Sequence, residues 1–211
     1  MGKPWDSKSG RREAVRQIHR HLVVCEDEKS AADYLRAFKV SDDFAEVVVE
    51  GGAGNTDSVV EKALELRAAA MTSGTPYASV WCVFDRDSFP AKNFNRAFDL
   101  ARGDDTRDVH IIWSNECFEL WYLLHFEFRV TGIGRKELYA ELSKPTRLGK
   151  KYDKADKTVF ALLKDKLPTA MKHAQKLLDD YGTTLNAGRD NPSTNVHELV
   201  AVLHALGQLG G

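Results

Sequence analysis

Residues 80–87 of the chain, VWCVFDRD, decide the fold that we expect. Five apolar residues in a row, rich in β-branched and aromatic types, predict a strand that is buried on both faces. The strand ends in Asp85 and Asp87, and the carboxyl ends of parallel strands line the crevice where an open α/β sheet binds ligands. Two acids at such an edge repel each other unless a cation shares them, and hard oxygen ligands suit Mg²⁺ or Mn²⁺. The alternative is that both aspartates only shape a turn or cap the following helix.

Length and composition indicate an ordinary globular protein. A chain of 211 residues is enough for one medium domain, or for one domain with a small appendage, and its 43% hydrophobic content allows a sizeable core. We expect no membrane span and no signal peptide, because no apolar run approaches the roughly 20 residues that cross a bilayer. Cys25, Cys82 and Cys117 lie in apolar surroundings without Cys-x-x-Cys spacing, so they should be reduced core cysteines. These features predict a cytoplasmic protein.

Strand and helix patterns alternate along the first part of the chain. Buried strands are expected at residues 18–25, 45–50, 80–85 and 109–113, and helices at about 30–38, 56–70 and 90–102. Such alternation predicts an α/β fold with a mostly parallel, four-stranded sheet covered by helices.

From Thr131 onward the pattern changes to helices without strands, so we predict an all-helical C-terminal part. The expected organisation is a partly ordered basic segment over residues 1–17, an α/β core over 18–130, and a helical subdomain over 131–211 that packs on the core. The polar segment 191–195, NPSTN, precedes the last helix, and helix capping explains its composition.

A second acid follows another expected strand. Glu26 comes directly after the first strand, as Asp85 does after the third, so both should lie at one edge of a parallel sheet. Three consecutive carboxylates are also typical of a solvated loop, and we prefer that interpretation for Asp27 and Glu28. Glu26 is therefore the third candidate ligand for a metal ion.

The segment after the fourth strand contributes two more candidates. Residues 116–126 are apolar nearly all round the expected helix, which predicts that the helix is buried. Glu119 lies within it, and a carboxylate in a buried helix must be paired, hydrogen-bonded or metal-bound, so structural and functional roles stay open. Asn115 lies one turn earlier on the same face, whereas His125 is better explained as a structural histidine.

A glycine-rich loop precedes the second expected helix. Glycines before a helix N-terminus can present backbone N–H groups to a phosphate, which makes Gly54, Asn55 and Thr56 candidates for anion binding. The loop is not a Walker loop, because no Lys-Ser/Thr pair follows the last glycine. A flexible turn is an equally good interpretation.

Positive charge is concentrated in the second half of the chain. The net charge is −1, but residues 141–176 contain ten lysines and arginines against four acids. Lys150, Lys151 and Lys154 lie in one basic loop with a single tyrosine, and with Arg86 they are candidates for nucleic-acid contacts. The alternative is a solvated, lysine-rich surface.

These residues carry a resemblance to known proteins. A glutamate after one strand and an Asp-x-Asp after a later one resemble the TOPRIM arrangement of topoisomerases, primases, OLD-family nucleases and small ribosomal-RNA maturases. More specifically, six motifs occur in the order of the RloB family, a group of small TOPRIM-like proteins associated with restriction-modification and antiphage defence loci. The motifs are VCE at 24–26, GNT at 54–56, VFDRD at 83–87, SNECFELW at 114–121, YDK at 152–154 and NPSTNVH at 191–197. The resemblance covers residues 20–206, with one departure: Asp27 stands where TOPRIM domains usually have glycine.

The resemblance implies a TOPRIM-like sheet and phosphodiester chemistry. Asp85 and Asp87 would hold Mg²⁺ or Mn²⁺, while Glu26 would share the ion or act as a general acid or base. Asn115 and Glu119 would complete the site. The expected function is a metal-dependent endonuclease acting on DNA or RNA in antiphage defence, with a possible protein partner from a defence locus and no membrane.

Two other functions remain open at this point. One is a non-catalytic nucleic-acid-binding or adaptor protein, in which a partner supplies the activity. The other is a different phosphotransfer enzyme, because Asp-x-Asp after a strand is also the nucleophile motif of haloacid-dehalogenase-like folds. That second function would need a Ser or Thr and a Lys at later strand ends; Ser114 offers the first, and Glu26 would have no role.

Overall fold

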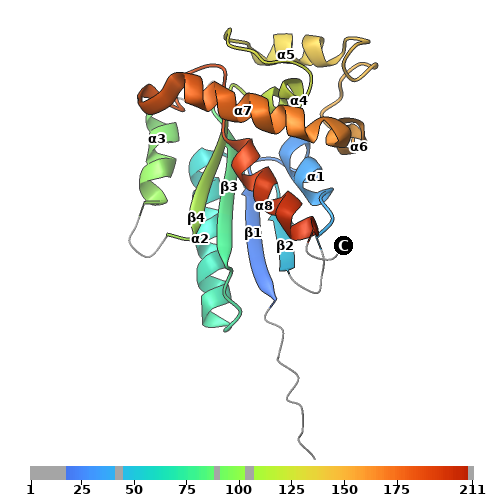
Figure 1. Ribbon diagram of the computed structural model, residues 1–211. Helices are drawn as coiled ribbons and strands as arrows, with labels where there is room; N and C mark the ends of the chain where they lie inside the picture. The colour runs from blue at the N-terminus through green and yellow to red at the C-terminus, as the bar shows by residue number, and fades with distance from the viewer. Residues whose placement is uncertain (1–17, 41–44, 88–90, 103–106, 209–211) are drawn as a thin grey trace, which may run out of the picture.

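The centre of the molecule is a five-stranded sheet. The structure, a computed structural model, describes residues 18–40, 45–87, 91–102 and 107–208. Four parallel strands lie in the order β2-β1-β3-β4, and a short fifth strand, β5, pairs antiparallel with β4 (Figure 1). The strands are β1 (His19–Cys25), β2 (Ala45–Glu50), β3 (Ser79–Asp85), β4 (Val109–Asn115) and β5 (Ser193–Thr194). The prediction of an α/β fold with a mostly parallel sheet is confirmed.

Two details of that prediction are wrong. The sheet has five strands, not four, and the fifth comes from the C-terminal part that we expected to be all helical. Residues in β5 are polar and number only two, so they show no hydrophobic alternation that would predict a strand. Their pairing arises from tertiary structure, because the backbone groups at the edge of β4 need hydrogen-bond partners.

Helices cover both faces of the sheet. On one face lie α2 (Thr56–Thr72) and α3 (Ala91–Leu100), packed on one set of strand side chains. The helices in the core cluster of the other face are α1 (Ser30–Arg36), α4 (Glu119–Leu124), α5 (Arg135–Leu142), α6 (Val159–Leu163), α7 (Leu167–Tyr181) and α8 (Val196–Gln208). Figure 1 shows α8 in front of the sheet, with α7 and α5 near the carboxyl ends of its strands. The C-terminal half thus contributes to the same core as the sheet.

Strand β3 occupies the middle of this arrangement. All its residues from Ser79 to Phe84 are buried, as the apolar run predicts. Cys82 and Phe84 contact the α2 and α3 side, whereas Trp81 and Val83 face the opposite core. The five residues from Val80 to Phe84 are apolar because the strand is covered on both faces, and the charged Asp85 comes only at the rim of the sheet, where the strand ends.

The order of the strands creates a topological switch point. From β1 the chain crosses to β2 on one side and later returns to β3 on the other, so the connections diverge between β1 and β3. Open α/β sheets bind ligands at such a point, outside the carboxyl ends of the strands. Cys25 is paired with Val83 in the register, and the Glu26 N–H donates to the Val83 carbonyl at 3.0 Å. The fold therefore places Glu26 beside the end of β3.

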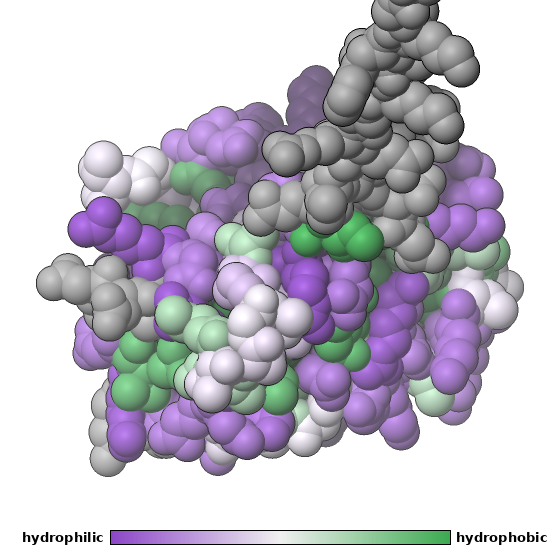
Figure 2. Space-filling model, turned by 90° about the horizontal axis from the view of Figure 1, so that it is seen from below, coloured by the Kyte–Doolittle hydropathy of each residue, from purple (hydrophilic) through white to green (hydrophobic). Residues whose placement is uncertain are grey.

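Few large apolar side chains are exposed among the described residues. The exposed large apolar side chains belong to Ile18, Met71, Val130 and Leu162, which lie far apart in the sequence. Seen from below, onto the amino ends of the strands, the visible surface is mainly hydrophilic with separate apolar patches (Figure 2). Among the described helices, none combines the length and apolarity needed to cross a membrane.

One buried amide links β4 to α8. The Asn195 side chain accepts from the Trp113 N–H at 2.8 Å and donates to the Ile111 carbonyl at 2.9 Å, while only 2% of the residue is exposed. The side chain thus takes the place of a further strand residue along the β4 edge. Without it, two backbone groups would lose their partners.

We expect Asn195→Ala to lower the free energy of unfolding by about 1–3 kcal/mol. The Trp113 N–H and the Ile111 carbonyl would stay buried without hydrogen-bond partners, and each would cost its desolvation energy. Lys62→Ala is the control, since Lys62 forms only an exposed ion pair with Glu65 and should change stability by less than about 1 kcal/mol. Urea denaturation of both variants measures the difference. Equal stability of the two would refute the role given to Asn195.

Candidate functional site

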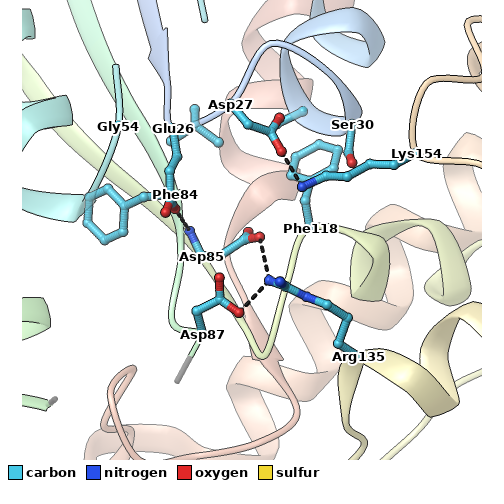
Figure 3. A pocket seen from close by; sticks show the side chains of 12 residues that line it. Glu26, Asp27, Ser30, Gly54, Phe84, Asp85, Asp87, Phe118, Arg135 and Lys154 are labelled. Atoms are coloured by element: carbon cyan, nitrogen blue, oxygen red, sulfur yellow. Dashed lines mark hydrogen bonds and ion pairs between the residues drawn. The ribbon is translucent and has the colours of Figure 1, made fainter. Parts of the chain in front are cut away.

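A polar cavity opens at the switch point. Its volume is about 230 Å³, and it lies at the carboxyl ends of β1 and β3. Four carboxylates and two cations line it together with apolar groups: Glu26, Asp27, Asp85, Asp87, Arg135 and Lys154. Figure 3 shows Glu26, Asp85 and Asp87 on one side of this acidic cavity, and Arg135 and Lys154 reaching in from the other.

Glu26 is fixed against the end of β3. Its carboxylate Oε2 accepts a hydrogen bond from the Asp85 N–H at 3.0 Å. Burial raises the pKa of Glu26, and the charges of Asp87 and Asp27 raise it further, against the lowering effect of the Asp85 N–H and Lys154. A carboxyl group of this kind holds a proton at a higher pH than a solvated one, which suits proton transfer.

Asp85, the last residue of β3, and Asp87, in the loop that follows, extend into the same cavity. Backbone bonds tie this loop to the end of β4: the Arg86 N–H donates to the Ser114 carbonyl at 2.8 Å, and the Asp87 N–H to the Glu116 carbonyl at 3.1 Å. Asp87 has a φ of 45°, in the left-handed region that few non-glycine residues adopt. Burial raises the pKa of Asp85 well above its usual range, and the charges of Glu119, Glu26 and Asp87 act in the same direction.

Two cations offset this negative charge. Arg135, the first residue of α5, forms an ion pair with Asp87, and its Nη2 lies 3.7 Å from Asp85 Oδ2. Lys154 forms an ion pair with Asp27. Burial alone would lower the pKa of Lys154, but the charges of Asp27, Glu119 and Asp85 raise it above its usual value. Both cations come from the C-terminal half of the chain.

Sequence reasoning missed part of this arrangement. Arg135 has no distinctive spacing, and only the general need of buried acids for a counter-ion could have signalled it. Asp27 lies in the loop after β1, as expected, but its carboxylate also lines the cavity and pairs with Lys154, which folding brings from a distant loop. Glu28 fits the interpretation as a solvated loop residue better, since its half-exposed side chain pairs with Arg36 at 2.9 Å.

Glu119 is buried behind the cavity and does not line it. Its Oε1 accepts hydrogen bonds from Ser30 Oγ at 2.8 Å and Tyr152 OH at 2.7 Å, and the residue is 1% exposed. Tyr152 lies two residues before Lys154, so this bond fixes the loop that carries the lysine. The contacts favour a positioning role for Glu119 over a direct part in chemistry.

Asn115 and Arg86 point toward the 187–188 loop. The Asn115 side-chain amide donates to the Ala187 carbonyl at 3.2 Å, and the Arg86 Nε donates to the Gly188 carbonyl at 2.6 Å. Neither side chain is among those that line the acidic cavity. His125 is buried with its Nδ1 2.9 Å from the Trp121 carbonyl, and burial lowers the pKa of His125 to about 4, as befits a structural histidine.

The residues predicted to bind an anion or a nucleic acid do not lie together. Of the three candidates for anion binding, Gly54 lines the cavity, whereas Asn55 caps α2 by accepting from the Ser58 N–H at 3.1 Å. Thr56 is buried, and its hydroxyl has no hydrogen-bond partner. Lys150 forms a surface ion pair with Asp156 at 2.6 Å, and Lys151 is exposed.

The donor set fits a divalent cation in its chemistry. Asp85, Asp87 and Glu26 offer only carboxylate oxygens, the ligands that Mg²⁺ and Mn²⁺ prefer. In the described part of the chain, however, no three His, Cys, Asp or Glu side chains are arranged so that they could already hold a metal ion. The Arg135 guanidinium lies against Asp85 and Asp87, so a metal ion would compete with it for the same oxygens.

Comparison with known proteins identifies the family of the chain. The family model described as RloB-like protein matches residues 21–203. The chain belongs to the RloB-like family. The match to this family runs from β1 into α8 and includes every charged residue of the acidic cavity. Neither the curated proteins nor the solved structures contain a match.

The raised pKa of Asp85 predicts a stabilising substitution. A carboxyl group whose pKa is raised by folding favours the folded state at low pH, and that contribution is lost as the pH rises through the raised pKa. Asp85→Asn carries no charge, so in excess chelator it should be more stable than the wild type at neutral pH. An increase of about 1 kcal/mol would raise Tm by about 2–4 °C, and the difference should shrink toward pH 4.

Asp87→Asn is the matched variant for this experiment. It also removes a carboxylate, but it takes away the nearer of the two carboxylates that pair with Arg135, so its Tm should not rise. Thermal unfolding monitored by circular dichroism measures both. An Asp85→Asn variant less stable than the wild type at neutral pH would contradict this account of the acidic cavity.

Proposed function

We propose that the chain is a metal-dependent nuclease that hydrolyses phosphodiester bonds in DNA or RNA. The observation that carries the proposal is the convergence of Glu26, Asp85 and Asp87 on one cavity at the ends of two neighbouring parallel strands. The same three positions match the TOPRIM pattern of a strand-end glutamate and an Asp-x-Asp. A TOPRIM-like arrangement of the sheet, a role in antiphage defence and a protein partner from a defence locus are parts of the same proposal and rest on the family resemblance.

The residues of the cavity have distinct roles in this reaction. Asp85 and Asp87 would hold Mg²⁺ or Mn²⁺, which neutralises charge on the non-bridging phosphate oxygens when it is bound. Glu26, with its raised pKa and its anchored carboxylate, would transfer a proton to or from the attacking water or the leaving oxygen.

The two cations suit the phosphate group. Arg135 and Lys154 line the cavity opposite the acids, and each is now paired with a carboxylate. A guanidinium group can bind a phosphate through two parallel hydrogen bonds, while an ammonium acts as a point charge. Arg135 and Lys154 would therefore exchange their carboxylate partners for phosphate oxygens when a nucleic acid binds.

A specific observation favours a second function. Because Arg135 and Lys154 already compensate the acids, the cavity could bind an anion without a metal ion, as a non-catalytic nucleic-acid-binding or adaptor protein would. The haloacid-dehalogenase-like function has less support. The Ser114 hydroxyl lies 2.9 Å from the Thr194 hydroxyl, is buried, and does not line the cavity.

Cleavage of single- and double-stranded DNA and RNA should require Mg²⁺ or Mn²⁺. Asp85→Asn and Asp87→Asn should each reduce the cleavage rate by at least about 100-fold, because loss of a ligand should exceed the 10- to 100-fold effect of outer-shell partners. Glu65→Gln is the control, since Glu65 is an exposed residue of α2. Gel assays with labelled oligonucleotides measure the rates.

Two results would count against the nuclease. Equal cleavage in excess chelator would exclude the proposed use of a metal ion. Salt-dependent binding without cleavage of any substrate, unchanged in Asp85→Asn, would favour the binding or adaptor function.

The basic loop should contribute to affinity through phosphate contacts. Replacing Lys150, Lys151 and Lys154 together with Ala should flatten the slope of log affinity against log salt by about two to three units, because each contact contributes about 0.7 to 0.9. Lys62→Ala should leave the slope unchanged. Fluorescence anisotropy over a salt series measures it. An unchanged slope in the triple variant would assign the loop to a solvated surface.

A further inference from the structure

A second cavity lies beside the acidic one. Its volume is about 450 Å³, and it is bounded by α3, by the Trp113 side chain of β4 and by the loop at 185–188. Aromatic side chains form much of its wall, and amide side chains stand among its polar groups. We name it the aromatic groove and define it by Phe94, Asn95, Phe98, Trp113, Asn186 and Gly188.

The two cavities share a wall. Phe84 lines the acidic cavity, and its ring makes edge contacts with Phe94 at 5.4 Å and Phe98 at 6.4 Å between centroids. Figure 3 shows the Phe84 ring directed away from Asp85 and Asp87. Arg86, between these aspartates, donates to the Gly188 carbonyl in the aromatic groove. Phe84 and Arg86 therefore connect the acidic cavity to the aromatic groove.

Two of the three aromatic side chains of the groove are accessible to solvent, whereas Phe94 is fully buried beneath them. Phe98 and Trp113 are both partly exposed, and their rings meet edge to face at 5.9 Å. The Trp113 Nε1 donates to Ser193 Oγ at 3.4 Å, which restrains the indole ring. An aromatic surface that is held in place and accessible to solvent is suited to stacking against another planar group.

We propose that the aromatic groove binds a nucleobase of the nucleotide next to the phosphate in the acidic cavity. This inference rests on the proposed action on nucleic acid and names the part of the substrate that lies outside the acids. Aromatic side chains stack on any base because every base has a flat face. The Asn95 amide can donate to and accept from base edges, and the Asn186 NH2 group can donate while its Oδ1 accepts from the Gly188 N–H at 3.1 Å. A free phosphate could accept from the amides but could not stack on the rings, and an aliphatic side chain would form no hydrogen bond with the amides.

Binding of short oligonucleotides separates a base from a phosphate as the ligand. The probes are single-stranded octamers of deoxyribonucleotides and ribonucleotides, each with a counterpart in which all bases are replaced by abasic sites. Affinities for the full chain are measured by fluorescence anisotropy in excess chelator, so that cleavage plays no part. The wild type should prefer the base-containing octamer over the abasic one.

Phe98→Ala should weaken binding of the base-containing octamer by about 5- to 100-fold, the range expected when a base loses its stacking partner, and should leave abasic binding unchanged. Phe98→Leu keeps an apolar side chain of similar volume, which protects the fold, and should lose most of the same preference. Phe160→Ala is the matched control. Phe160 is a partly buried aromatic residue in another cavity of about 450 Å³, bounded by residues 37–39 after α1, by α6 and by α8.

The outcomes distinguish this inference from the proposed function. A nuclease that shows no preference for bases, or whose preference survives in both Phe98 variants, would overturn the aromatic groove as a base site. A chain that cleaves nothing, but whose base preference disappears in Phe98→Ala and Phe98→Leu, would refute the nuclease and still support the groove. Equal losses in Phe160→Ala would show a general effect of aromatic removal and would also overturn the inference.

Discussion

The compensation of clustered carboxylates is the constraint on which the rest of the structure depends. The strand order places Glu26 and Asp85 at one switch point, and Asp87 and Asp27 follow them into the same cavity. Removing such groups from water is costly unless cations and hydrogen-bond donors face them. The sheet provides the acids but no cations to face them, so the compensation has to come from the second half of the chain.

That requirement explains how the two halves are joined. Arg135 reaches Asp87 from the start of α5, and Lys154 reaches Asp27 from the loop before α6. The bond from Tyr152 to the buried Glu119 fixes this loop to α4, so the lysine is held by the core of the protein. The same contacts that stabilise the acids hold two cations over them. Stability and the proposed chemistry therefore depend on one set of ion pairs.

Periodicity was enough to predict the four parallel strands and the acids at their ends, because buried strands and strand-terminal carboxylates are local features of the sequence. It could not predict β5, whose two polar residues are ordered by the edge of β4. The sequence pattern also could not predict which residues pair with the acids. Arg135 and Asp27 look like ordinary surface residues until folding brings distant segments together. The burial of Glu119 was predictable from its helix, but its hydrogen bonds to Ser30 and Tyr152 were not.

The central claim is that Glu26, Asp85 and Asp87 form one site for a divalent cation. A crystal of the protein soaked in Mn²⁺ and measured at a wavelength where manganese scatters anomalously tests it directly. The account predicts an anomalous peak bonded to Asp85 and Asp87, with Glu26 beside it and Arg135 displaced from both aspartates. A peak elsewhere, or crystals in which Arg135 keeps both aspartates at saturating Mn²⁺, would contradict it.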